Sequence, residues 1–244
     1  MAKLTLIFNK YVYFRDPIKK DYMETKYTED QFEEFEKYDA LSDQDIFTKI
    51  WTEPRRIFKF INDTQYEKYL YILLIFAGIV RAFDRASSKD MGDHSSLLFI
   101  VFGCIVGGGM LGWISYYIYS ALLSWTGKWL NGVGNTSSIY RMMAYAMIPS
   151  ILGLVFLFLQ ISVFGNDYFR SNTDYLESSI EGSIVFWISF TMEMLLSFAS
   201  LVLMVIGLSE VQKFSIGKAI INLILPVAFI VVPIVLIVFI ATIF

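Results

Sequence analysis

Residues 97–125 read LLFIVFGCIVGGGMLGWISYYIYSALLSW, a stretch without a charged side chain. The hydrocarbon core of a bilayer is about 30 Å thick, and an α-helix needs about 20 apolar residues to cross it. This stretch is longer than that, and it ends on a tryptophan, a residue that is common at the membrane–water interface. It therefore predicts a helix that spans a membrane.

Similar apolar runs on both sides predict an all-α polytopic membrane protein with five transmembrane helices. The spans are expected near residues 66–83, 97–125, 144–164, 184–208 and 219–244. The first has the shortest apolar core, Tyr69 to Val80, a length that also suits a re-entrant or interfacial segment. Lys68 and Arg81 flank this core, and their long side chains can reach toward the headgroups, which favours a span.

The charged residues are concentrated ahead of the first span, and the net charge is −3. Because no strongly basic face is present, we expect no nucleic-acid partner. Cys104 and His94 are the only cysteine and histidine, so we expect neither an intramolecular disulfide nor a metal site. No phosphate-binding loop, nucleophile elbow or zinc motif occurs, and we therefore expect no catalytic residues, no cofactor and no enzymatic activity.

The N-terminal part of the chain is predicted to approach the membrane in two steps. Residues 1–43 are expected to be polar and partly flexible, and their acidic end could also be a surface for a partner protein. Residues 44–65 are expected to form an amphipathic helix in the headgroup plane, with Pro54 starting a second helical segment. The expected interface residues are Trp51, Arg55, Arg56 and Phe58. The alternative is a helix packed on the rest of the protein.

Glycines in the second span are spaced four residues apart. The two pairs are Gly103/Gly107 and Gly108/Gly112. Small residues at this spacing let helix backbones approach closely inside a membrane, so the pairs predict a packing seam. The alternative is a local break in the helix that lines a cavity.

A few charged residues lie within or beside the spans. Glu193 stands near the centre of the fourth span, where charges are costly and usually face the bundle interior or a wet cavity. It could couple to protons or ions, or bond to Gln160 or Asn222 on a neighbouring helix. Arg81, Asp84 and Arg85 suggest either an ion-paired helix end or a contact with lipid headgroups.

The distribution of lysine and arginine predicts the orientation. These residues are more numerous near the span ends on the N-terminal side than on the opposite side, which has Arg81, Arg85, Lys89 and Arg170. Cytoplasmic loops carry the excess of positive charge. We therefore expect a multi-pass protein of the cell (inner) membrane, with a cytoplasmic N-terminus and the C-terminus outside.

Several short passages together resemble the Yip domain family, the Ypt/Rab-interacting membrane proteins, and are closest to its bacterial branch. The passages are residues 50–56, 78–86, 103–112, 125–129, 145–149 and 207–212. The family's Tyr-x-x-x-Pro element matches at Tyr145 and Pro149, with Ala144 where eukaryotic members usually have glycine. Of the Asp-Leu-x-Gly-Pro element only Glu53 and Pro54 remain, which weakens any transfer of Rab-type GTPase binding. The resemblance implies five spans and a cytoplasmic N-terminal segment.

Two functional hypotheses follow from these features. The first is a non-enzymatic, Yip-like scaffold that organises the bilayer or binds partner proteins, and that could form a homo-oligomer through its glycines. The alternative is a transporter of small solutes or ions, or a lipid translocator, built from kinked helices around Glu193.

Overall fold

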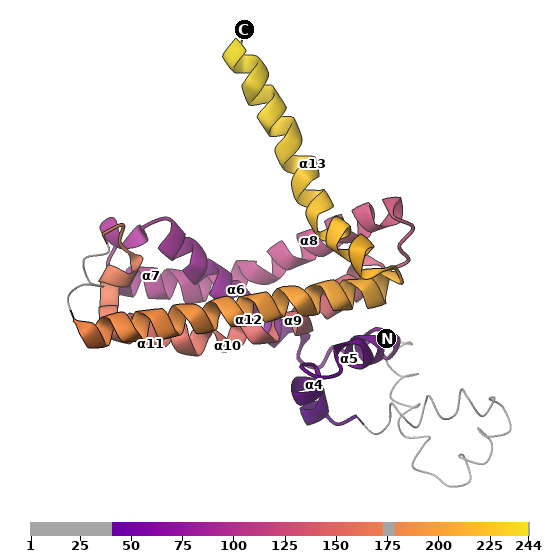
Figure 1. The fold of residues 1–244 in the computed structure, drawn as a ribbon, viewed down its shortest axis with the longest axis horizontal. Coiled ribbons are helices and arrows are strands. Elements are labelled where there is room, and N and C mark those ends of the chain that lie inside the picture. Colours follow the sequence, from indigo (N-terminus) through magenta and orange to yellow (C-terminus); the bar gives the residue numbers. More distant parts are fainter. Residues whose placement is uncertain (1–40, 173–178, 244) are drawn as a thin grey trace, which may run out of the picture. The chain divides into compact units, whose positions relative to one another are not determined.

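The computed structural model describes residues 41–172 and 179–243, and these residues are helical apart from short turns (Figure 1). By its contacts the chain divides into two units, residues 1–50 and 51–244. Most of the expected polar segment 1–43 lies outside the described residues. Each unit is taken by itself below.

The described part of the first unit is the short helix α4 (Asp43–Lys49). Ser42 caps it, because its hydroxyl accepts a bond from the Asp45 backbone N–H at 3.2 Å while the Asp45 carboxylate accepts one from the Ser42 backbone N–H at 2.9 Å. Lys49 closes the turn with a 2.7 Å ion pair to Asp45. The Lys49 ammonium and the Ser42 donors hold the pKa of Asp45 well below its usual range.

The second unit contains the helices that could lie in a membrane. They are α5 (Pro54–Asp63), α6 (Leu70–Ser88), η1 (Met91–Asp93), α7 (Leu97–Gly103), η2 (Cys104–Gly108), α8 (Gly109–Trp129), α9 (Thr136–Ala146), α10 (Ile148–Leu152), α11 (Leu154–Phe164), η3 (Gly165–Phe169), α12 (Ile180–Gln212) and α13 (Ile216–Ile243). Pro54 opens α5, as the sequence predicts. The long helix α12 packs along α9, α10 and α11, which follow one another in the chain (Figure 1).

Three runs in the described residues are long and apolar enough to cross a bilayer. They are Leu97–Trp129, Thr136–Phe169 and Ile180–Gln212, and a shorter apolar helix covers Ile216–Phe229. The first expected span is the 19-residue helix α6, which is about 28 Å long but carries three charges in its C-terminal half. An apolar, helical membrane protein is thus what the structure supports, and the full count of five spans stays a prediction.

The glycine-rich middle of the second span does not break the helix. Residues Cys104–Gly108 form the π-helical turn η2, which joins α7 to α8. A π-turn holds one residue more than an α-turn and occurs mostly as a single bulge in an α-helix. The helix therefore continues through this region with a locally widened turn.

The close helix contact runs through Gly78, a residue that the glycine pattern did not include. A Cβ atom on Gly78 would lie 2.6 Å from the Cα of Gly112 and closer still to the Gly108 carbonyl oxygen. By contrast, a Cβ on Gly103 or Gly107 would meet nothing within 4 Å among the residues that the structure describes. Within the chain the seam thus consists of α6 against Gly108 and Gly112, and a packing role for the other pair stays a prediction.

The helix α6 buries one face before this seam and a different face after it. In its first half the buried side chains include Leu70, Leu74 and Ala77. In its second half they are Ile79, Phe83 and Ala86. These later side chains form a core cluster with residues of α7, η2, α11 and η3. The charged residues of α6 consequently lie on the exposed side of its second half.

The Gly78 seam yields a test of the fold. We expect Gly78→Ala to lower the free energy of unfolding by about 1–3 kcal/mol, because the added methyl group forces two backbones apart. The matched control is Gly103→Ala, whose methyl group points into open space. Thermal unfolding of the purified protein in detergent, followed by tryptophan fluorescence, measures both changes. Equal midpoints for the two variants would contradict the seam.

Candidate functional site

The buried face of α12 carries small and polar residues at seven-residue intervals. Gly182 and Ser189 are seven residues apart. A second series with the same spacing begins four residues after Ser189 and consists of Glu193, Ser200 and Gly207. This face packs on α9, α10 and α11. The hydroxyl of Ser200 accepts a bond from the Ser150 backbone N–H and one from the Ser150 hydroxyl, both at 2.9 Å.

Glu193 is half-buried at the contact of α12 with α11. Its Cγ would lie 3.9 Å from a Cβ on Gly153, and the side chain of Gln160, which is only 1% exposed, is its hydrogen-bonding neighbour. Its Oε1 atom is buried without a hydrogen-bond partner, and so is Oγ of the fully buried Ser189 one turn away. The sequence suggested two partners for Glu193. Gln160 lies beside it, whereas Asn222 bonds to Thr126 and Leu123 instead.

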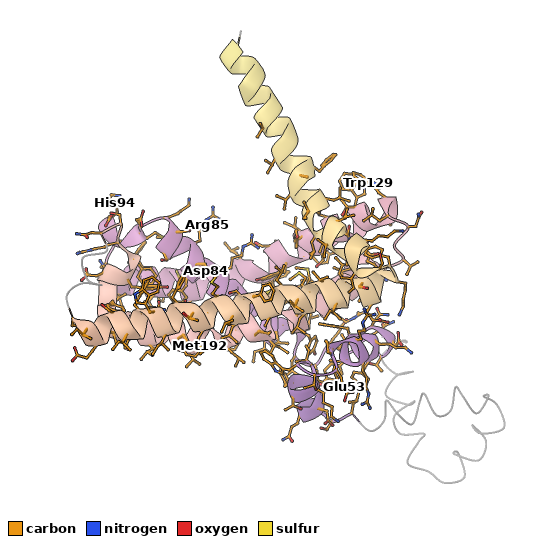
Figure 2. The ribbon with its side chains drawn as sticks, viewed as in Figure 1. Glu53, Asp84, Arg85, His94, Trp129 and Met192 are labelled. Carbon is orange, nitrogen blue, oxygen red and sulfur yellow. The ribbon has the colours of Figure 1, made fainter. Side chains whose placement is uncertain are left out.

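The charges of α6 are not paired with one another. Among the residues that the structure describes, Arg81, Asp84 and Arg85 form no ion pair, so the expected pair between Arg81 and Asp84 is absent. The Asp84 carboxylate is attracted to Arg81 and repelled by the carboxylate of Glu193. Figure 2 shows Asp84 and Arg85 on the same stretch of α6.

Gln212, at the end of α12, bonds to three residues in other segments of the chain and was not singled out from sequence. Its Oε1 accepts from the Gly134 backbone N–H at 2.9 Å, its Nε2 donates to the Leu123 carbonyl at 3.2 Å, and its own carbonyl accepts from the Val133 N–H at 3.2 Å. A Cβ on Gly127, Gly132 or Gly134 would press on the Gln212 side chain. The signal in the sequence was the group of three glycines between residues 127 and 134. Their partner Gln212 is distant in the chain.

Asn222 of α13 completes this joint. Its Nδ2 donates to the Leu123 carbonyl at 3.2 Å, and its Oδ1 accepts from the Thr126 hydroxyl at 2.8 Å. Lys218 adds a bond from its Nζ to the Leu130 carbonyl at 3.2 Å. Phe229, further along α13, rests on the indole rings of α8, one of which is Trp129 in Figure 2. The ends of α8 and α12 and the start of α13 are thus fixed together.

The family-motif residues Tyr145 and Pro149 are buried at the bend between α9 and α10. The hydroxyl of Tyr145 accepts a bond from the Tyr69 backbone N–H at 3.4 Å, and its ring contacts that of Tyr66. Nearby, the guanidinium of the buried Arg141 donates to a carboxylate oxygen of Glu67 at 2.8 Å. These contacts anchor the turn before α6.

The expected membrane-interface residues have different surroundings. Trp51 is 43% exposed and Arg55 is exposed, whereas Phe58 is fully buried, next to Gly207 of α12. Arg56 forms a 2.8 Å ion pair with Glu53. The apolar side of α5 therefore faces α9 and α12, the packed alternative, while the residues around Glu53 remain on the surface.

At the other end of the unit, η1 meets η3. The side-chain amide of Asn166 donates to the Gly92 carbonyl at 3.0 Å, and the Ser171 hydroxyl donates to Asp93 at 2.7 Å. The Ser171 hydroxyl bond holds the pKa of Asp93 below its usual range. The part of the chain that the structure describes contains no group of three or more His, Cys, Asp or Glu side chains that could hold a metal ion.

Long apolar helices joined by buried polar contacts define an integral membrane protein of the α-helical class. A family model described as the Yip1 domain matches residues 48–237, which is most of the chain. The chain therefore belongs to the Yip1 domain family. No curated protein matches it, and no solved structure matches it.

The Gln212 joint makes a direct prediction for stability. Gln212→Leu keeps a side chain of similar volume but leaves the buried Gly134 N–H without its acceptor, so we expect a loss of about 1–3 kcal/mol in the free energy of unfolding. The control is Gln44→Leu, the same chemical change at an exposed position. Thermal unfolding in detergent compares the two, and an unchanged midpoint for Gln212→Leu would contradict the role of the joint.

Proposed function

We propose that this chain is a non-enzymatic membrane scaffold of the Yip1 family, which organises the bilayer or holds partner proteins in it. The observation that carries the proposal is the start of α5. Trp51, Glu53 and Arg55 are exposed there, while the next residues of the same helix are buried against α9 and α12. The family-motif residue Glu53 is thus exposed at the start of a helix whose other side is packed on α9 and α12. Such an arrangement suits a recognition surface.

The polar contacts between helices support a scaffold. Gln212, Asn222, Ser200 and Arg141 all use their hydrogen-bonding groups to hold neighbouring segments. Polar contacts of this kind join helices in membranes, where water does not satisfy polar groups. A bundle joined in this way keeps the surface around Glu53 in a constant position.

The outer faces of the helices supply the membrane contact. Large apolar side chains are exposed along α7, α8 and α12, for example Phe99, Leu111 and Phe198. In a bilayer such faces contact lipid chains or another protein. At Gly103 and Gly107 an added Cβ would meet no atom of the described residues within 4 Å, and these are the positions where we place a contact between copies. The acidic N-terminal segment is a second surface for a partner.

We further propose a bacterial inner-membrane location with the N-terminus in the cytoplasm and the C-terminus outside. Exposed Asp63 precedes α6, and exposed Lys89 follows it. In a Cys104→Ala background, Asp63→Cys should react with a membrane-impermeant maleimide only after cells are opened, and Lys89→Cys should react in intact cells. If only Asp63→Cys were labelled in intact cells, the orientation would be the reverse of the one proposed. If both variants were labelled in intact cells, α6 would not cross the bilayer core.

One specific observation favours a translocator as the second candidate. Glu193 Oε1 and Ser189 Oγ are buried without partners, although such groups are usually satisfied by protein or by water. Carboxylates of this kind inside a membrane often mark a path for ions or protons. If a wet path reaches Glu193, the bundle moves a solute, an ion or a lipid.

A flux assay separates the two candidates. We expect proteoliposomes of the wild type to show proton flux and fluorescent-lipid scrambling at the level of protein-free vesicles, because a scaffold has no path. Glu193→Gln should behave identically, as should Glu210→Gln, whose parent residue pairs with Lys213 at 2.6 Å near the end of α12. Flux that disappears only in Glu193→Gln would overturn the scaffold and establish the translocator.

A further inference from the structure

The C-terminal half of α6 and its cap carry three exposed cations along one side of the helix. Arg81, Arg85 and Lys89 follow one another at intervals of four residues, and each of them is exposed. Four residues advance an α-helix by slightly more than one turn, so each cation lies about 6 Å along the axis and about 40° around it from the one before. The three side chains therefore form a continuous basic stripe, the α6 stripe.

The positive charge of the α6 stripe has no partner within the described chain. None of its three side chains forms an ion pair or a side-chain hydrogen bond with a residue that the structure describes. By contrast, Arg56, Arg141 and Arg170 each bond to a carboxylate at 2.8–2.9 Å. Like charges four residues apart on a helix destabilise it, so the stripe favours an anion beside it.

Neither Asp84 nor the helix dipole accounts for the whole stripe. Asp84 is the single carboxylate in this half of α6, and it lies about 60° around the helix from Arg81, on the side away from Arg85. The dipole favours cations at the C-terminus of a helix, but its effect falls off within the last turn. Because α6 ends at Ser88, the dipole stabilises Arg85 and Lys89 but not Arg81, which lies about 10 Å before that end. The remaining anion must come from outside the described chain.

The apolar start of α6 sets the depth of the stripe in a bilayer. Residues 70–80 carry no charged side chain and cover about 16 Å of helix, which is about half of the hydrocarbon core. Arg81 therefore lies in the second half of the core, and Lys89 lies close to the headgroups. Long basic side chains extend from such positions toward the headgroup region. The exposed side of a membrane helix is surrounded by lipid, so the anions that the stripe meets are lipid phosphates.

The chemistry of the stripe favours an anionic headgroup over a zwitterionic one. A guanidinium group binds phosphate oxygens through paired N–H donors, and an ammonium group binds phosphate as a point charge. In a zwitterionic lipid the phosphate charge is balanced by the lipid's own ammonium group. In an anionic lipid that charge is left for the protein, and here three cations face it with only one carboxylate nearby.

We propose that the α6 stripe binds an anionic phospholipid through its phosphate group, with Arg81 and Arg85 as the main contacts and Lys89 nearest the headgroup surface. Phosphatidylglycerol is the simplest lipid of this chemistry. The proposal rests on the proposed crossing of the bilayer by α6 and does not depend on the scaffold function. The maleimide labelling described above tests that crossing separately.

Native mass spectrometry of the full-length protein tests the proposal. The purified protein is mixed with equal amounts of phosphatidylglycerol and phosphatidylcholine that have the same acyl chains, and the retained lipid is identified by its mass. We expect the wild type to retain phosphatidylglycerol preferentially. Each basic side chain near an anionic lipid contributes about fivefold to binding. Arg81→Gln should therefore reduce the preference about fivefold, and Arg81→Gln with Arg85→Gln should reduce it more than about tenfold.

Matched variants separate a specific stripe from a general effect of charge. Lys89→Gln and Lys128→Gln each remove one exposed lysine at a helix end, of α6 and of α8 respectively, and only the first should reduce the preference. Asp84→Asn should raise the preference because it removes a repelling carboxylate, and Arg81→Lys should retain most of it. Equal retention of the two lipids by the wild type would overturn the proposal. So would a wild-type preference in both Lys89→Gln and an Arg81→Gln, Arg85→Gln protein that unfolds at the wild-type temperature.

Discussion

The arrangement of the helices depends on one side chain, Gln212, inserted among Gly127, Gly132 and Gly134. Buried backbone N–H and C=O groups need hydrogen-bond partners within the protein, and Leu123 and Gly134 are buried. Gln212 supplies them to Gly134 and Leu123. A Cβ on Gly127 or Gly132 would overlap the Gln212 side chain, and a Cβ on Gly134 would lie 3.1 Å from it. Three glycines and one amide thus set how α8, α12 and α13 meet.

The polar residues at the two ends of the membrane unit have different surroundings. At the Gln212 end the buried side chains of Asn222 and Tyr145 bond to neighbouring segments, while Nε of the buried Arg141 has no partner. Toward the η1 end, Glu193 and Ser189 have unsatisfied atoms, and the charges of α6 are open. Unpartnered buried polar atoms thus occur toward both ends of the unit, and α6 packs on α8 between them through its contact at Gly78.

The sequence predicted the features that depend on a single segment. Uncharged runs longer than the bilayer core indicate membrane helices, and Pro54 marks a helix start because its ring fits the first turn. Burial of Phe58 could not be predicted in this way, since an apolar helix face suits lipid headgroups and another helix equally well. Gly78 and Gln212 were missed for the same reason, because each acts through residues distant in the chain.

The π-turn Cys104–Gly108 has a consequence for the history of this helix. A single residue inserted into an α-helix is absorbed by such a bulge, so the segments on either side keep the faces they presented before. Ile100 on one side and Tyr116 on the other can therefore stay buried while the chain between them changes in length by one residue. A one-residue gap at this point in an alignment of relatives would then record the gain or loss of the bulge, with both flanking helices still equivalent.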